Sequence, residues 1–272
     1  MGIFLTNFHS LLTFLWLNMK RSILIVFFLL LVEEIGSFGV KWYTTYSFHL
    51  RSRMNDIDQS FSSLDKILFN RFSASVSDEI EEPRTTTYTA LINQISDMTI
   101  KYPLDVVHTK GKRMLTKLFP SWLLSQYKWM FATPFPRFSA WMNAWVTHLA
   151  TNWLMGNSTV VDLQLVDGVV LEQQGLLVEK CRFLETAGCV STCINACKIP
   201  TQRFFMEEMG LPVTLKPNIT DFSCTFEFGI KPGPLMFEAS LADQDCLTNC
   251  SSNKRYSSGI CKKCLEPIDH SF

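Results

Sequence analysis

Residues 181–202 of the chain read CRFLETAGCVSTCINACKIPTQ. Together with Cys224, this stretch holds five of the nine cysteines in a sequence of 272 residues. A cysteine-rich block in an otherwise ordinary sequence is typical of a metal site, a set of disulfides or a group of buried structural thiols. The spacing alone leaves these three interpretations open, and it favours a metal site most.

The spacing of the central cysteines limits what one metal ion could bind. If residues 188–198 are helical, Cys189, Cys193 and Cys197 lie at i, i+4 and i+8 on one face. The outer two are then roughly 12 Å apart along the axis. That is too far for both to bind one small ion through thiolate bonds of about 2.3 Å. Either two of the three share a centre and the third serves another, or the helix breaks before Pro200.

The pattern also narrows the kind of metal. There is no His-x3–5-His and no pair of CxxC motifs at finger spacing, so the block is not a zinc finger. Cysteine runs that end near a proline occur in iron–sulfur proteins, and this pattern is closer to them. Cys246 and Cys250 could complete such a site, and Cys261-x2-Cys264 has the tighter spacing of metal knuckles.

The same block carries a resemblance to a known family. The matching strings are Lys180–Glu185, the Cys-x3-Cys-x3-Cys-Lys-Ile-Pro-Thr-Gln run that ends at Gln202, Pro217-Asn218, Asp221–Cys224 and Phe228-Gly229. They resemble the C-terminal domain of the plant DWARF-type beta-carotene isomerases, and the similar stretch runs from about Tyr88 to Cys250. Members of that family are plastid, iron-containing enzymes that interconvert all-trans and 9-cis beta-carotene at the start of strigolactone synthesis. The resemblance implies an iron-dependent carotenoid cis/trans isomerase of algal type.

The chemistry of such a reaction gives the cysteines a role. Rotating one double bond of a polyene requires lowering its π-bond order, which gain or loss of one electron achieves. Acid and base side chains are poor at one-electron steps, whereas cysteine-bound iron is suited to them. Our hypothesis is that iron, either alone or as an iron–sulfur cluster, is held by cysteines of this set: Cys181, Cys189, Cys193, Cys197, Cys224, Cys246 and Cys250.

Two rival interpretations remain. One is a secreted binding protein stapled by disulfides, which the glycosylation sequons at Asn157, Asn218 and Asn249 keep open. The other is a catalytically silent member of the family that binds iron or a carotenoid.

Composition excludes several other functions. The 25 basic and 25 acidic residues balance, so nothing indicates a nucleic-acid partner. No Ser-His-Asp nucleophile elbow, phosphate-binding loop or Rossmann glycine fingerprint occurs, so hydrolase, nucleotide and hydride-transfer functions have no support.

Residues 1–55 have the pattern of a leader. Lys20 and Arg21 precede an 11-residue apolar run, residues 22–32, which is short for a spanning helix and fits a signal peptide. Residues 35–55 have no Asp or Glu and many hydroxyl side chains, as in a plastid transit peptide. We expect a two-part leader for plastid import; the alternatives are a secretory signal and a retained anchor.

The rest of the chain predicts an α+β fold. We expect a polar linker over residues 56–86, the isomerase-like domain over 87–250 and a cysteine-containing tail over 251–272. Apolar periodicity predicts helices up to Met155. Alternation over residues 159–180, with an Asp167-Gly168 turn, predicts a hairpin. The expected architecture is therefore a helical N-terminal half packed on a small antiparallel sheet, with a cysteine-rich C-terminal region.

An aromatic stripe marks the last of these helices. Five of the seven tryptophans fall between residues 122 and 153, and Trp141, Trp145 and Trp153 share one apolar face. Such a stripe is usually core, but it could also bind the carotenoid or lie against a plastid membrane as a peripheral contact. His108 and His148 are isolated, and we expect them to be packed or hydrogen-bonded rather than metal ligands.

Overall fold

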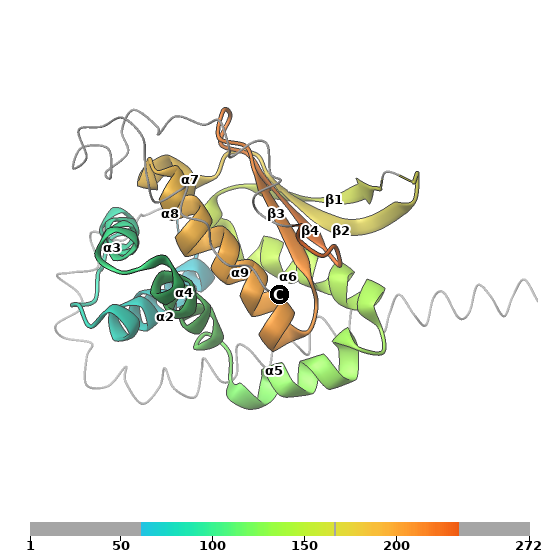
Figure 1. Cartoon of the computed structure of the whole chain (residues 1–272), viewed down its shortest axis with the longest axis horizontal. Helices are drawn as coiled ribbons and strands as arrows, with labels where there is room; N and C mark the ends of the chain where they lie inside the picture. The colour runs from blue at the N-terminus through green and yellow to red at the C-terminus, as the bar shows by residue number, and fades with distance from the viewer. Residues whose placement is uncertain (1–60, 166, 234–272) are drawn as a thin grey trace, which may run out of the picture. The chain divides into compact units, whose positions relative to one another are not determined.

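The computed structural model describes residues 61–165 and 167–233. Helices come first along the chain and a four-stranded antiparallel sheet follows, so the α+β prediction is confirmed (Figure 1). The predicted leader (1–55), the tail (251–272) and Cys246 and Cys250 lie outside the described residues.

The helical part has the following elements: α2 (Ser63–Ile80), α3 (Tyr88–Lys101), α4 (Leu104–Thr116), α5 (Ser121–Tyr127), the π-helical η2 (Lys128–Ala132) and α6 (Pro136–Met155). Prolines set its boundaries, as expected from their missing N–H. Pro103 lies between α3 and α4, and Pro136 occupies the first turn of α6. Helix α4 runs without a break through Met114, because Leu104, Val107 and Met114 form one buried face.

The sheet has the strand order β1-β2-β4-β3, with β1 (Ser158–Gln164), β2 (Val170–Val178), β3 (Val213–Pro217) and β4 (Cys224–Phe228). The predicted hairpin is confirmed, with Ser158 opposite Val178 and Gly168 at φ 82° in the turn. Helix α6 packs across β2, β1 and β4. One face of the sheet is thereby covered by the helix that carries the tryptophan stripe (Figure 1).

The polar linker predicted over residues 56–86 is wrong for its central part. Residues 63–80 form α2, which starts with a capping box between Ser62 and Asp65. Its Phe69, Phe72 and Val76 are buried in the core. The charged run at residues 78–82 hid this apolar periodicity, since it begins inside the last turn of the helix.

The cysteine-rich stretch forms a nearly continuous helical run. It follows the short α7 (Arg182–Ala187) and consists of α8 (Val190–Thr192), the π-helical η3 (Cys193–Lys198), α9 (Ile199–Arg203) and the π-helical η4 (Phe204–Met209). The helix does not break before Pro200, which excludes one of the two predicted arrangements. The π-helical η3 lies just before Pro200, and its wider turn leaves room for the proline ring. Short π-helical segments of this kind are frequent at functional sites. Gly210, at φ 70°, ends the run.

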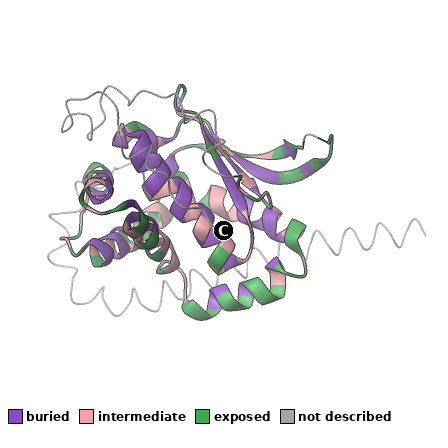
Figure 2. Cartoon of the chain, in the orientation of Figure 1, coloured by how far each residue is buried: buried purple, intermediate pink, exposed green. Residues whose placement is uncertain are grey.

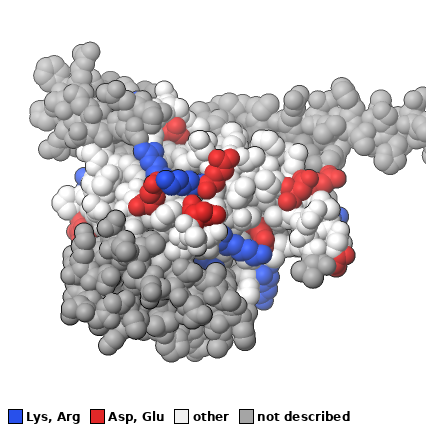
Figure 3. Space-filling model, turned by 90° about the horizontal axis from the view of Figure 1, so that it is seen from above, with Lys and Arg blue, Asp and Glu red and all other residues white. Residues whose placement is uncertain are grey.

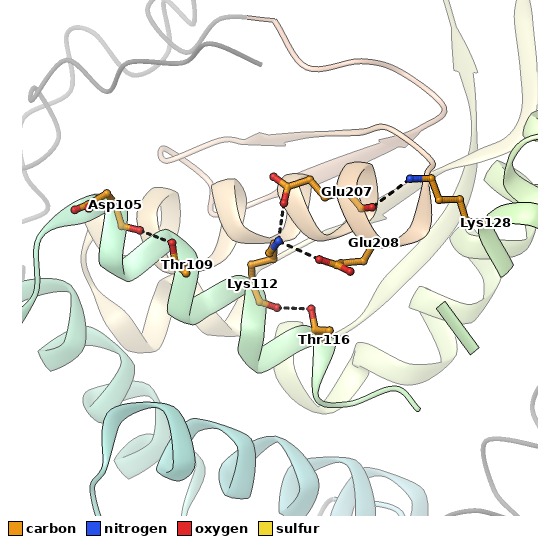
Figure 4. A network of polar contacts seen from close by, with 7 residues as sticks. All are labelled: Asp105, Thr109, Lys112, Thr116, Lys128, Glu207 and Glu208. Carbon is orange, nitrogen blue, oxygen red and sulfur yellow. Dashed lines mark hydrogen bonds and ion pairs between the residues drawn. The ribbon is translucent and has the colours of Figure 1, made fainter. Parts of the chain in front are cut away.

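Polar contacts join this run to α4 and η2. Lys112 Nζ lies 2.6 Å from a Glu207 carboxylate oxygen and 3.0 Å from one of Glu208, and Lys128 Nζ lies 3.5 Å from the Glu207 carbonyl oxygen (Figure 4). Most of this helical run is buried, as Figure 2 shows. Cys193 and Cys197 therefore lie on a mostly buried helical run rather than on a surface loop.

Candidate functional site

Four cysteines from three separate segments line one small cavity. Cys181 precedes α7, Cys193 and Cys197 belong to η3, and Cys224 begins β4. The other lining residues are Met155, Phe183, Leu184, Lys198, Leu215, Pro217 and Phe226. The free volume is about 10 Å³, roughly what one water molecule needs. The cavity is therefore a thiol site and not a pocket for a large organic ligand.

A backbone hydrogen bond and strand pairing bring Cys181 and Cys224 to the helical run. The Cys181 N–H donates to the Phe222 carbonyl oxygen at 2.7 Å, and Phe222 adopts φ 63°. Cys224 is paired with Val178 of β2 and with Pro217 of β3. The strand and the turn before it thus place Cys224 and Cys181 on the same side of the helical run.

Of the three cysteines at four-residue spacing in this stretch, two line the cavity. Cys193 and Cys197 line the cavity, whereas Cys189 is fully buried before α8 and does not. This is the predicted arrangement in which two of the three share a centre. All five described cysteines are free thiols, so none of them supports the disulfide-stapled interpretation.

Burial is the main influence on the acidity of these thiols. It raises the pKa of Cys181, and it raises the pKa of Cys197 to about 12. The pKa values of Cys193 and Cys224 are raised well above the ordinary value, first by burial and then by the neighbouring thiols. The four groups are therefore protonated at neutral pH unless a metal displaces their protons.

A buried lysine borders the same cavity. Lys198 is 1% exposed and lies next to Cys197 in the sequence. Its positive charge partly offsets the raised pKa values of Cys193 and Cys224. Sequence reasoning gave Lys198 no role, although the neighbouring cysteines were a signal that it would face them.

An aromatic side chain and a guanidinium lie on the Cys181 side. The pKa of Tyr88 is raised by burial and by Cys181, and its hydroxyl donates to the Leu154 carbonyl oxygen at 2.6 Å. The Arg182 guanidinium carbon lies 4.5 Å from the centre of the Tyr88 ring. These contacts hold the start of α3 and α7 against the cavity.

The four thiols share a cavity without converging on one point. Within residues 61–165 and 167–233, no three Cys, His, Asp or Glu side chains are placed to hold a metal ion together. The histidines follow the expectation of ordinary polar contacts. His108 Nε2 lies 3.0 Å from Asn195 Oδ1, and His148 Nδ1 lies 3.0 Å from Ser158 Oγ.

The three tryptophans of the predicted stripe have different surroundings. Trp153 is 5% exposed and packs against Phe69 and Phe72 of α2. Trp141 and Trp145 are half-buried, and their indole N–H groups donate to the same Gln173 Oε1, at 2.9 and 3.2 Å. Trp153 therefore belongs to the core, whereas Trp141 and Trp145 form a half-buried pair that shares a hydrogen-bond acceptor on β2.

Among the described residues on the face seen in Figure 3, basic and acidic side chains lie interspersed. Among the described helices, none has the length and apolar character needed to cross a membrane.

Known proteins similar to this chain are named beta-carotene isomerases. The family model described as beta-carotene isomerase D27-like, C-terminal, matches residues 153–236, which include all four cavity cysteines. The chain is 31% identical over 203 residues to the chloroplastic beta-carotene isomerase D27 of Arabidopsis thaliana, covering 74% of each chain. It is 38% identical over 104 residues to the protein of that name from Medicago truncatula, covering 38% of this chain and 40% of the relative. No solved structure matches. The chain belongs to the beta-carotene isomerase D27 family.

Proposed function

We propose that this chain is a plastid enzyme that isomerises a double bond of a carotenoid, of the all-trans to 9-cis beta-carotene type. The name and chloroplast label of its relatives support this reaction and compartment. The observation that carries the proposal is the cavity lined by Cys181, Cys193, Cys197 and Cys224, inside the matched family region. The two-part leader predicted for residues 1–55 would direct import into the plastid. There the isomerisation would be a step toward apocarotenoids such as strigolactones.

The donor set of the cavity fits iron in its chemistry. Four cysteine thiols are the ligands that [2Fe–2S] and [4Fe–4S] clusters use. We propose Cys181, Cys193, Cys197 and Cys224 as residues that hold it, because all four line the cavity and Cys189 does not. The roles predicted for Cys246 and Cys250 stay predictions, since both lie outside the described residues. Such iron, when bound, supplies one-electron chemistry that lowers the π-bond order of the polyene.

The chain's own residues have two tasks in this proposal. The thiols must lose their protons on binding metal, and the buried Lys198 favours their charged form through its own charge. Phe183, Phe226 and Met155 surround the sulfurs with apolar atoms. Exclusion of water strengthens electrostatic interactions at the site.

The carotenoid itself must bind outside this cavity, because about 10 Å³ is far too small for it. We propose Trp141 and Trp145 as part of its binding surface, since half-buried aromatic rings suit a long flat apolar ligand. The role predicted for Trp153 stays a prediction, and its ring is covered by Phe69 and Phe72. A peripheral contact with a plastid membrane would supply the substrate.

The test is to purify the full chain without oxygen and to measure iron and acid-labile sulfide per chain in matched variants. Cys193→Ser should lose iron and isomerase activity, because Cys193 lines the cavity. Cys189→Ser replaces an equally buried thiol outside the cavity and should keep both. Full iron content and activity in Cys193→Ser would overturn the proposed ligand set.

A further inference from the structure

Helix α5, η2 and the loop before α6 carry a cluster of exposed aromatic and apolar side chains. Trp129 is 76% exposed, Phe135 59%, Trp122 48% and Met130 46%. Figure 2 shows α5 as mostly exposed. Large apolar side chains gathered on one segment in this way mark an interaction surface more often than chance exposure.

This segment is held firmly on the rest of the fold. Leu123, Leu124 and Tyr127 are buried on its inner face. The Asn143 side-chain amide of α6 donates to the Tyr127 hydroxyl at 2.6 Å. Lys128 packs so closely on Gly210 that a Cβ there would lie 2.7 Å from Lys128 Cγ. The exposed rings therefore sit on a structured support that presents them outward.

The surrounding sequence has a strong charge bias. The whole chain is neutral, yet residues 106–161 contain no Asp or Glu. The same residues carry these cations: Lys110, Lys112, Arg113, Lys117, Lys128 and Arg137. Lys112 and Lys117 are paired with carboxylates of other elements, whereas Lys128 and Arg137 flank the exposed rings and are themselves exposed. Lys128 Nζ also lies 3.5 Å from the Glu207 carbonyl oxygen, and the exposed rings thus have two cations, Lys128 and Arg137, beside them in the sequence.

This combination matches the surface of a bilayer better than that of a protein partner. Trp and Phe favour the boundary between headgroups and acyl chains, and Lys and Arg near it attract anionic lipids. A beta-carotene-type substrate is a hydrocarbon that dissolves in membranes. On that ground, which rests on the proposed function, we propose that Trp122, Trp129, Met130 and Phe135 insert into the surface of an anionic membrane.

The patch is also connected to the proposed carotenoid surface. The Phe131 ring lies 6.3 Å from that of Phe138, which stacks on Trp141 at 5.8 Å. Trp141 in turn shares Gln173 with Trp145. A row of aromatic rings therefore runs from Phe131, which follows Met130 of the patch in the chain, to Trp141 on α6, and an apolar substrate leaving the bilayer would stay in contact with it.

The test uses the full chain and vesicles of phosphatidylcholine with phosphatidylglycerol whose acyl chains carry bromine, which quenches nearby tryptophans. We expect quenching that is largely lost in the Trp122→Phe/Trp129→Phe double variant. It should persist in Trp16→Phe/Trp42→Phe, which removes the two tryptophans of the leader. Arg137→Gln should raise the vesicle concentration for half-maximal quenching by about fivefold. Ile67→Ser, which changes an exposed apolar residue of α2, should leave that concentration unchanged.

Quenching that survives in Trp122→Phe/Trp129→Phe, or that is lost in Trp16→Phe/Trp42→Phe, would overturn the proposal. So would a dimer in vesicle-free solution that dissociates in Trp129→Ser, since the patch would then be an interface between copies. None of these readouts needs isomerase activity. A failed isomerisation assay with intact quenching would therefore count against the proposed reaction alone.

Discussion

Pro200 packs directly on Gly111: a Cβ at Gly111 would lie 2.7 Å from Pro200 Cγ and 2.8 Å from its Cβ. This contact fixes the distance between α4 and the helical run that carries Cys193 and Cys197. Pro200 is accommodated at this point because its ring packs against Gly111, which has no side chain.

The contact predicts that Gly111→Ala destabilises the chain. In an ordinary helix this change is stabilising by up to about 1 kcal/mol. Here the clash with a stiff ring should reverse the sign and lower the free energy of unfolding by about 1–3 kcal/mol. Denaturant unfolding would measure this. Gly233→Ala, where nothing lies within 4 Å of the added Cβ, is the control and should be nearly neutral; a stabilised Gly111→Ala would contradict the packing.

The raised thiol pKa values predict how the stability of the metal-free chain depends on pH. The folded pKa of Cys197 is about 12, above its ordinary value of 9.0. Stability from the buried neutral thiol is fully present below about pH 9 and is lost as the pH rises towards 12. The urea midpoint of the metal-free chain should therefore hold up to about pH 9 and fall as the pH rises from 9 towards 12. The fall should be smaller in Cys197→Ala, and an equal fall would show that other groups cause it.

The two classes of tryptophan predict different phenotypes. Trp153→Ala should cost about 3–5 kcal/mol of stability, because it empties a core site against Phe69 and Phe72. Trp141→Ala removes a half-buried ring and one hydrogen bond to Gln173, so its cost should be about 1 kcal/mol. In the isomerase assay, Trp141→Ala should raise KM for the carotenoid. An unchanged KM would remove Trp141 from the substrate surface.

Local signals in the sequence were enough for part of the fold. The Asp167-Gly168 turn with alternating flanks predicted the β1–β2 hairpin, since turn chemistry and strand period act over a few residues. The i, i+4 spacing of Cys193 and Cys197 placed them on one helical face. Helix α2 was missed, because its apolar positions at Phe69, Phe72 and Val76 are separated by polar and small residues and are followed by a charged run.

The cavity required long-range information. Cys181 and Cys224 reach it through the pairing of β2 with β4 and the bond from the Cys181 N–H to Phe222, which no local pattern encodes. For the same reason the sequence did not separate Cys189 from the cavity group. It also did not place Lys198 beside the thiols, although Lys198 directly follows Cys197, since lysine is almost always exposed.

The most direct test of the proposed function is to incubate the anaerobically purified full chain with all-trans and, separately, with 9-cis beta-carotene, and to measure the isomer ratio over time by chromatography. We expect both reactions to approach the same ratio, with Cys193→Ser inactive and Cys189→Ser active. No conversion from either isomer by a chain that contains iron would contradict the account.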